Sequence, residues 1–191
     1  PLRRRFAAIA NIIKPLPSFE PRELYLDRLE AIVHFSWKPD FDLYGIGWDK
    51  PVRFVRGSQK QIFEEAIKKS WRGTVEDKFP ILQQYKFSIC FENCIFNGWI
   101  TEKIIDSLAA GCVPVYWGAP DIIQHIPQNT FIDYRKFKNY NELERYLRNM
   151  DECTYNEYIE NINAFLASDK FTPFTQEHFA KEMITLFNSY F

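Results

Sequence analysis

The stretch YKFSICFENCIFNGWITEKIIDSLAAGCVPVYWG, residues 85–118, constrains the fold of this chain most strongly. It contains two apolar runs, at 86–92 and 112–118, and a helix-like run at 101–111 lies between them. The apolar runs lack the polar alternation of a half-exposed strand, which indicates strands buried on both faces. Gly111 follows the helical run, where glycine commonly ends a helix. The stretch therefore predicts a strand, a helix and a second strand of one parallel sheet.

The same alternation of strands and helices continues on both sides of this unit. Further strands are predicted at 3–13, ending near Asn11, at 41–48 and at 130–134. Further helices are predicted at 22–35, at 58–71 with Ser58 as N-cap, and at 141–150, 154–168 and 175–191. A Pro-rich loop at 14–21 follows the first strand, and Pro80 interrupts a short turn or helix. We expect an α/β fold, a Rossmann-like parallel sheet with helices on both faces.

Composition excludes several classes of protein. The chain has 191 residues, of which 46% are hydrophobic, so it can bury the core of one domain or somewhat more. A net charge of −1 gives no electrostatic case for nucleic-acid binding. No apolar run approaches the roughly 18 residues of a membrane span. We therefore expect at most a peripheral association with membranes.

The sequence offers little for a metal site. Four cysteines are present, and Cys90 and Cys112 lie inside apolar runs, which predicts small core residues. No second pair or histidine cluster completes a set of ligands, so free thiols are expected. The motif DFD, Asp40 to Asp42, matches the D-x-D pattern of metal-dependent transferases. Because it enters a predicted strand instead of following one, we interpret it as polarity at the start of that strand.

Several polar side chains follow the strand at 86–92, and ligands of parallel sheets bind beyond such carboxyl ends. Thr101, Glu102 and Lys103 open the next helix, whose free N–H groups and positive dipole suit a phosphate. Lys103 is unfavourable for the helix itself, which hints at function. Glu102 could accept from ribose hydroxyls, and Trp99 could stack on a base. The alternative is ordinary helix charge and a solvated Lys103. As an exposed residue at a helix start, Lys103 is expected to contribute within about 0.5 kcal/mol to stability even if it binds the ligand.

The run from Tyr85 to Pro120 resembles the donor-binding signature of family-ten glycosyltransferases, the α-1,3/1,4-fucosyltransferases. The matching residues are Phe91-Glu92-Asn93, Thr101-Glu102-Lys103, Gly111, Val113-Pro114-Val115 and Gly118. The segments FDLYG with GW, GTVEDKFPILQQYKF and TFIDYRKFKNYNELERYL extend the likeness over roughly residues 6–147. A lone TEK would mean little, but ordered fragments across most of a domain are specific.

That resemblance implies the carboxyl-terminal, donor-binding half of a GT-B glycosyltransferase. Residues 1–170 would bind GDP-L-fucose, and 171–191 would form a closing helix that packs on an absent amino-terminal half or, in a homodimer, on a second copy. The family transfers fucose with inversion to N-acetylglucosamine or glucose of a glycan, and no cofactor or metal is expected. The implied location is cytoplasmic or peripheral to a membrane, as in bacteria, with the Golgi lumen as the eukaryotic alternative.

The resemblance also implies roles for individual residues. Lys103 would contact the diphosphate, Glu102 the ribose, Asn93 the phosphate and fucose, and Trp99 the guanine side, with Thr101 in the same motif. A phosphate-binding arginine is expected on the helix after the first strand, where Arg22 is favoured over Arg28. The groups with a catalytic role would be Lys103, Arg22 and Glu92.

Two points stay open in this interpretation. Glu92 would orient a sugar hydroxyl or local backbone, because the family's general base lies in the amino-terminal half. The alternatives to a fucosyltransferase are a glycosyltransferase for another nucleotide sugar and a non-catalytic domain that binds nucleotide sugars.

Overall fold

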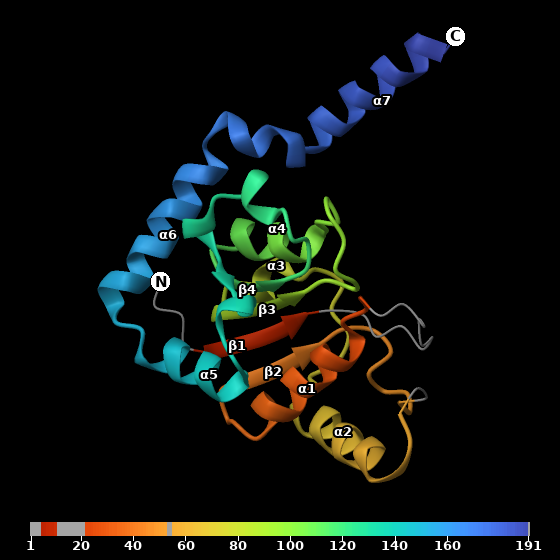
Figure 1. Cartoon of the computed structure of the whole chain (residues 1–191), viewed down its shortest axis with the longest axis vertical. Coiled ribbons are helices and arrows are strands. Elements are labelled where there is room, and N and C mark those ends of the chain that lie inside the picture. The colour runs from red at the N-terminus through yellow and green to blue at the C-terminus, as the bar shows by residue number, and fades with distance from the viewer. Residues whose placement is uncertain (1–4, 11–21, 53–54, 191) are drawn as a thin grey trace.

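The protein folds around one parallel sheet. The computed structural model describes residues 5–10, 22–52 and 55–190. Within them, five strands pair in the order β2-β1-β3-β4-β5, and all four pairings are parallel (Figure 1). The strands are β1 (Arg5–Ala10), β2 (Phe41–Tyr44), β3 (Tyr85–Phe91), β4 (Val113–Trp117) and β5 (Ile132–Asp133). This arrangement confirms the predicted parallel α/β sheet.

Helices connect the strands and extend beyond the last one. They are α1 (Tyr25–Ser36), α2 (Gly57–Ser70), α3 (Phe79–Leu82), α4 (Glu102–Ala109), α5 (Tyr140–Asn149), α6 (Glu152–Leu166) and α7 (Gln176–Tyr190). Short 3₁₀ turns are η1 (Ile122–Gln124), η2 (Gln128–Thr130), η3 (Tyr134–Lys136) and η4 (Asp169–Phe174). Gly111 has φ +64° just after α4, as predicted for a residue that ends a helix.

Both faces of the sheet are covered by helices. Neighbouring side chains of β3 point to opposite faces, so their contacts show what covers each one. On one face, Phe91 stacks with Tyr140 of α5 at 6.5 Å, and Phe87 meets Tyr155 of α6 at 5.9 Å between ring centroids. On the other face, the Cys90 thiol lies 3.1 Å from the hydroxyl of Ser107 in α4. The central strands are therefore buried on both sides, which explains their continuous apolar sequence.

The strand order defines one special position at the edge of the sheet. After β1 the chain pairs β2 on one side, and then returns to place β3 on the other side of β1. Connections leave in opposite directions at this point, so the β1–β3 boundary is the topological switch point of a doubly wound sheet. Ligands of such sheets bind beyond the carboxyl ends of the strands there. The segment that follows β3 begins at Glu92, inside the predicted site.

Some details differ from the sequence-based expectations. Ser58 is not the N-cap of α2: the helix begins one residue earlier, at Gly57, and Arg56 occupies the cap position without a side-chain cap. The expected strand at 130–134 is shortened to Ile132–Asp133, because one 3₁₀ turn ends at Thr130 and another begins at Tyr134. The predicted end of the first strand near Asn11 and the loop at 14–21 lie outside the described residues.

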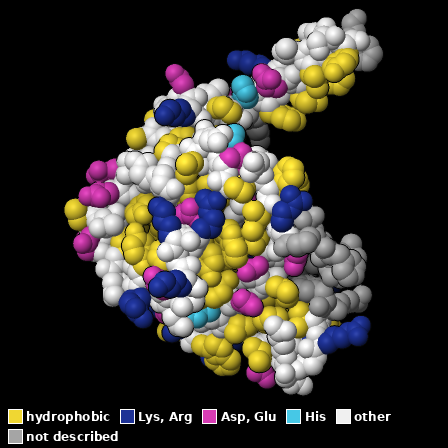
Figure 2. All heavy atoms as spheres, in the orientation of Figure 1, with side chains coloured by type: hydrophobic (Ala, Val, Ile, Leu, Met, Phe, Trp, Pro, Cys, Tyr) yellow, Lys and Arg dark blue, Asp and Glu magenta, His cyan; other side chains and the backbone are white. Residues whose placement is uncertain are grey.

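The last helix, α7, projects from the body of the protein (Figure 1). None of its described residues is buried, and apolar side chains lie along it in the space-filling view (Figure 2). Phe179 is 66% exposed, Met183 37% and Phe187 58%. Among the described residues, no helix has the length and apolarity needed to cross a membrane.

Candidate functional site

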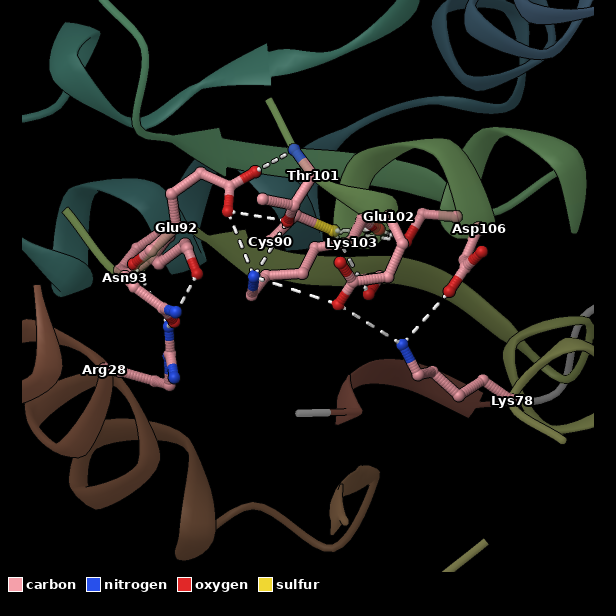
Figure 3. A network of polar contacts seen from close by, with 12 residues as sticks. Arg28, Lys78, Cys90, Glu92, Asn93, Thr101, Glu102, Lys103 and Asp106 are labelled. Carbon is pink, nitrogen blue, oxygen red and sulfur yellow. Dashed lines mark hydrogen bonds and ion pairs between the residues drawn. The ribbon is translucent and has the colours of Figure 1, made fainter. Parts of the chain in front are cut away.

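Glu92 is the centre of the polar network at the carboxyl end of β3 (Figure 3). Its amide N donates to the Trp117 carbonyl at 2.8 Å, which extends the pairing of β3 with β4 by one residue. Its side chain is fully buried, and both carboxylate oxygens accept hydrogen bonds. Oε1 accepts from the Thr101 amide at 2.9 Å, and Oε2 accepts from the Thr101 hydroxyl at 2.8 Å and from Lys103 Nζ at 3.0 Å. Glu92 therefore orients local backbone, one of the two predicted roles.

Lys103 is not solvated, contrary to the alternative raised by the sequence. Its side chain is only 9% exposed, and its ammonium is shared between Glu92 and the hydroxyl of Thr101 at 2.8 Å. A cation in the first turn opposes the helix dipole. The buried carboxylate at 3.0 Å supplies the negative charge that offsets this cost. The expected exposure of Lys103 is therefore wrong, and because Lys103 neutralises a buried charge, we predict that it contributes more than about 0.5 kcal/mol to stability.

Arg28 stabilises the same strand end from the opposite side. It projects from α1, is 1% exposed, and one terminal nitrogen faces three acceptors. These are the carbonyls of Phe91 at 2.9 Å and Glu92 at 3.0 Å, and Oδ1 of Asn93 at 3.1 Å. Burial lowers the pKa of this guanidinium from its ordinary value. Arg28 thus joins α1 to β3 and fixes the side chain of Asn93.

Arg22 is exposed and lies on a segment paired with the chain that follows β3. The amide of Leu24 donates to the Asn93 carbonyl at 2.9 Å, and that of Ile95 donates to the Arg22 carbonyl at 2.7 Å. The Arg22 guanidinium stands over the Phe96 ring, 5.4 Å from its centroid. We call the paired residues 22–24 and 93–95 the backbone ribbon. It places Arg22 beside the site, although Arg22 and Lys103 are far apart in sequence.

The remaining predicted residues line the exposed side of this network. Trp99 is 45% exposed on a loop that is tied down by the Gly98 amide, which donates to Asp121 at 2.9 Å. The side chain of Glu102 is 59% exposed and lies 3.8 Å from Lys78 and 3.9 Å from Lys103. Partial burial would raise the pKa of Glu102, but these two lysines outweigh it and lower the value. An accessible aromatic ring and an ionised carboxylate thus flank the start of α4.

Beneath the start of α4 lies the thiol of Cys90, which sequence reasoning treated as a core residue. Its sulfur lies 3.3 Å from the Lys103 carbonyl and 3.1 Å from the Ser107 hydroxyl. Burial raises the pKa of this thiol to about 11, so it remains protonated at neutral pH. Cys90 is a packing group and a weak donor under α4, as the apolar context predicted.

The two carboxylates of the DFD motif both face arginines. Asp42 is buried in β2 and contacts Arg5, Arg72 and the Tyr85 hydroxyl, the last at 2.6 Å. Asp40 makes two hydrogen bonds of 3.0 Å with Arg148. No group of three candidate metal ligands occurs in the described ranges. These aspartates therefore hold strands and helices together, away from the carboxyl edge that carries Glu92.

The sequence matches one protein family over residues 54–185, more than half of the chain. The matching model is described as glycosyltransferase family 10 (fucosyltransferase), C-terminal. The chain belongs to this family. The resemblance seen in the signature residues is thereby confirmed.

Relatives of this family-10 chain include bacterial and vertebrate proteins. An alpha-(1,3)-fucosyltransferase FucT of Helicobacter pylori is 39% identical over 74 residues, which cover 39% of this chain and 16% of that protein. GDP-fucose protein O-fucosyltransferase 3 of Gallus gallus is 42% identical over 85 residues, 43% of this chain and 18% of that protein. The chain thus matches less than a fifth of the length of these relatives.

Solved structures agree on the fold. The crystal structure of an alpha1,3-fucosyltransferase with GDP superimposes with a TM-score of 0.55 at 25% identity, over 82% of this chain and 38% of that chain. The structural neighbours are GT-B glycosyltransferases, so the expected fold class is confirmed.

The structure brings most of the predicted site residues to one edge of the sheet. Glu92, Thr101 and Lys103 form one hydrogen-bonded group, and Arg28 donates both to the Glu92 carbonyl and to the Asn93 side chain. What sequence reasoning missed is the burial of Lys103. A carboxylate that directly follows a buried strand was the available signal, because such a charge requires a partner.

Proposed function

We propose that this chain is the nucleotide-sugar half of a fucosyltransferase and binds GDP-L-fucose at the carboxyl edge of β1 and β3. The observation that carries the proposal is the position of Lys103. Its ammonium is fixed at the first turn of α4, where the helix dipole already favours a phosphate. The family membership supports fucose as the sugar, and the GDP complex of a solved neighbour supports guanine as the base.

In the proposed complex, the cations face the diphosphate. Lys103 and Arg22 contact the phosphates, because Arg22 is exposed beside the site whereas Arg28 already carries three acceptors of the strand end. Cleavage of the sugar–phosphate bond leaves negative charge on GDP, and cations held at fixed positions stabilise that charge as it develops. They replace a bridging metal, so we propose that no metal or other cofactor is required.

The flanking groups select the nucleoside. Trp99 offers an accessible indole face for the guanine side, and Glu102 offers an ionised carboxylate to the ribose hydroxyls. Asn93 points its amide toward the phosphate and fucose region, with its oxygen held by Arg28. Three different functional groups thus surround one nucleotide sugar.

Transfer also needs a general base, which we assign to an amino-terminal half outside this chain. Both oxygens of the buried Glu92 carboxylate accept hydrogen bonds from Thr101 and Lys103, so Glu92 is not placed to deprotonate an acceptor. The exposed apolar side chains of α7 fit a helix that packs on that half.

The acceptor we propose is a hydroxyl of N-acetylglucosamine or glucose in a glycan. The name of the Gallus gallus relative motivates a protein hydroxyl as the alternative. The location we propose is cytoplasmic or peripheral to a membrane, with the Golgi lumen as the alternative. It depends on where the acceptor is found. Subcellular fractionation of the full-length protein tests it.

The experiment is a calorimetric titration of the chain with GDP, GDP-fucose, GDP-mannose and UDP, each with and without EDTA. We expect binding of GDP and GDP-fucose, no binding of UDP, and no effect of EDTA. Equal affinity for GDP and UDP would refute the guanine assignment. Loss of binding in EDTA would refute a metal-free site.

A further inference from the structure

Gly118, directly after β4, lies so close to Glu92 that a residue with a Cβ atom would not fit at this position. A Cβ atom at position 118 would stand 2.4 Å from Glu92 Cγ, 2.8 Å from Glu92 Cβ and 2.6 Å from the Tyr116 hydroxyl. Such distances are shorter than van der Waals contact permits. The φ of Gly118 lies outside the left-handed region, so the backbone does not require glycine here. The requirement is space for the side chain of Glu92.

The atoms around Gly118 have little freedom to move away. The amide of Glu92 is bonded to the carbonyl of Trp117, so the backbones of the two strands are fixed to each other at this level. The Tyr116 hydroxyl accepts from the Ala119 amide at 3.0 Å and is fixed as well. Glu92 Cγ can rotate away from an added methyl group, but Glu92 Cβ moves only with its backbone. The methyl group would therefore displace the Glu92 carboxylate and also strain the contact between the two strand ends.

Displacement of that carboxylate would release Lys103. An ammonium has three N–H donors. Glu92 takes one and the Thr101 hydroxyl takes another, and the Glu102 carboxylate lies 3.9 Å away, beyond hydrogen-bond distance. No further hydrogen bond to this ammonium occurs in the described part of the chain. One donor thus remains for a ligand, with its direction set by the other two. A lysine side chain is flexible, so this fixation removes an entropic cost that binding would otherwise carry.

We propose that Gly118 and Glu92 are positioning residues, which aim the third N–H of Lys103 at the diphosphate of the bound nucleotide. The inference rests on the proposed function for the identity of the ligand. It adds a chain of contacts that runs from the end of β4, through the end of β3, to the phosphate. Gly118 leaves room for Glu92. Glu92 and Thr101 then hold Lys103, which contacts the ligand.

A double-mutant cycle on GDP affinity tests the proposal, with Gly118→Ala, Lys103→Ala and the double variant measured by calorimetry. Lys103→Ala should weaken binding about tenfold to hundredfold, the range of a hydrogen bond to a charged group. Gly118→Ala should weaken binding about tenfold or more by misplacing the same ammonium. The double variant should bind no more weakly than Lys103→Ala alone, because both changes remove one interaction.

Thr101→Val provides a second cycle if Lys103→Ala fails to fold. It removes the hydroxyl that holds Lys103 and keeps the backbone amide that Glu92 accepts from. GDP affinity should fall in Thr101→Val, and adding Gly118→Ala should cost less than it does in the wild type. A strictly additive loss in both cycles would overturn the proposal, as would an unchanged affinity in Gly118→Ala.

A control separates positioning from general destabilisation. Leu147→Ala removes a buried side chain of α5 beside Phe6 and Lys86, at the amino ends of the strands. It should lower Tm at least as much as Gly118→Ala and leave GDP affinity unchanged. If the wild-type chain does not bind GDP at all, the proposed function fails. If the wild type binds and the losses are additive, only the positioning role fails.

Discussion

Replacing Lys103 by alanine should destabilise the protein as well as weaken nucleotide binding. The change removes the cation that faces the fully buried Glu92 carboxylate at 3.0 Å, and it also removes the bond from that ammonium to the Thr101 hydroxyl. A buried carboxylate that loses its partner retains its desolvation cost without the compensating attraction. The stability loss therefore arises in the unliganded protein.

Two known ranges bound the stability loss expected for Lys103→Ala. Loss of one hydrogen bond to a charged group costs about 1.5–3 kcal/mol. Breaking a buried ion pair by removing one partner costs about 3–5 kcal/mol. Glu92 keeps two hydrogen bonds from Thr101, which places the loss near the junction of these ranges, at about 3 kcal/mol.

Urea denaturation monitored by the intrinsic fluorescence of the tryptophans measures this loss. The matched control is Lys78→Ala, which removes a lysine that is 31% exposed and lies 3.1 Å from Asp106. A partly exposed pair of this kind should contribute at most about 1 kcal/mol. A loss in Lys103→Ala no larger than that of Lys78→Ala would refute the reasoning, and Lys103 would be a surface charge in solution.

Three further predictions concern other parts of the structure. Arg22→Ala should weaken GDP binding and change stability by no more than about 0.5 kcal/mol. Arg28→Ala should lower the free energy of unfolding by several times that amount. Urea denaturation and calorimetry on both variants test this difference. Asn139→Ala should cost about 1 kcal/mol of stability, because its side chain caps α5 by accepting from the Glu142 amide at 3.0 Å; urea titration checks this. Burial raises the pKa of the Cys90 thiol from 9.0 to about 11, so the folded state binds this proton more tightly than the unfolded state. The resulting stabilisation is complete below pH 9 and is lost as pH rises through 11; denaturation across this window should show a steeper decline in the wild type than in Cys90→Ala.

The fold was predictable because it follows from local patterns. Continuous apolar runs, such as the one that became β3, indicate a strand covered on both faces, and Gly111 marks the end of a helix through its backbone conformation. The Ser58 prediction failed because an N-cap preference cannot fix a helix start to one residue. Side-chain caps do exist at Asn139 for α5 and at Asp151 for α6, and each was visible in the sequence only as a polar residue before a helical run.

The sequence predicted which polar residues lie near the start of α4, and not the contacts between them. The motif around Lys103 placed a cation at a helix start, and the family resemblance supplied a ligand. The burial of that cation depends on Glu92, whose position depends in turn on Gly118 in the neighbouring strand. Such a contact is set by the register of β3 against β4 and by the absence of a side chain, neither of which local periodicity encodes.

The loop between the backbone ribbon and α4 has a consequence for how nucleotide preference can evolve. Both of its ends are held: the chain at 93–95 is hydrogen-bonded to 22–24, and Thr101 is held by Glu92. Substitutions at the exposed Trp99 would leave Arg22 and Lys103 where they are, whereas Phe96 in the same loop supports the Arg22 guanidinium on its ring. In the proposed complex, recognition of the base is thus separable from recognition of the phosphates, and a descendant of this protein could exchange one nucleobase for another by changes around Trp99 alone.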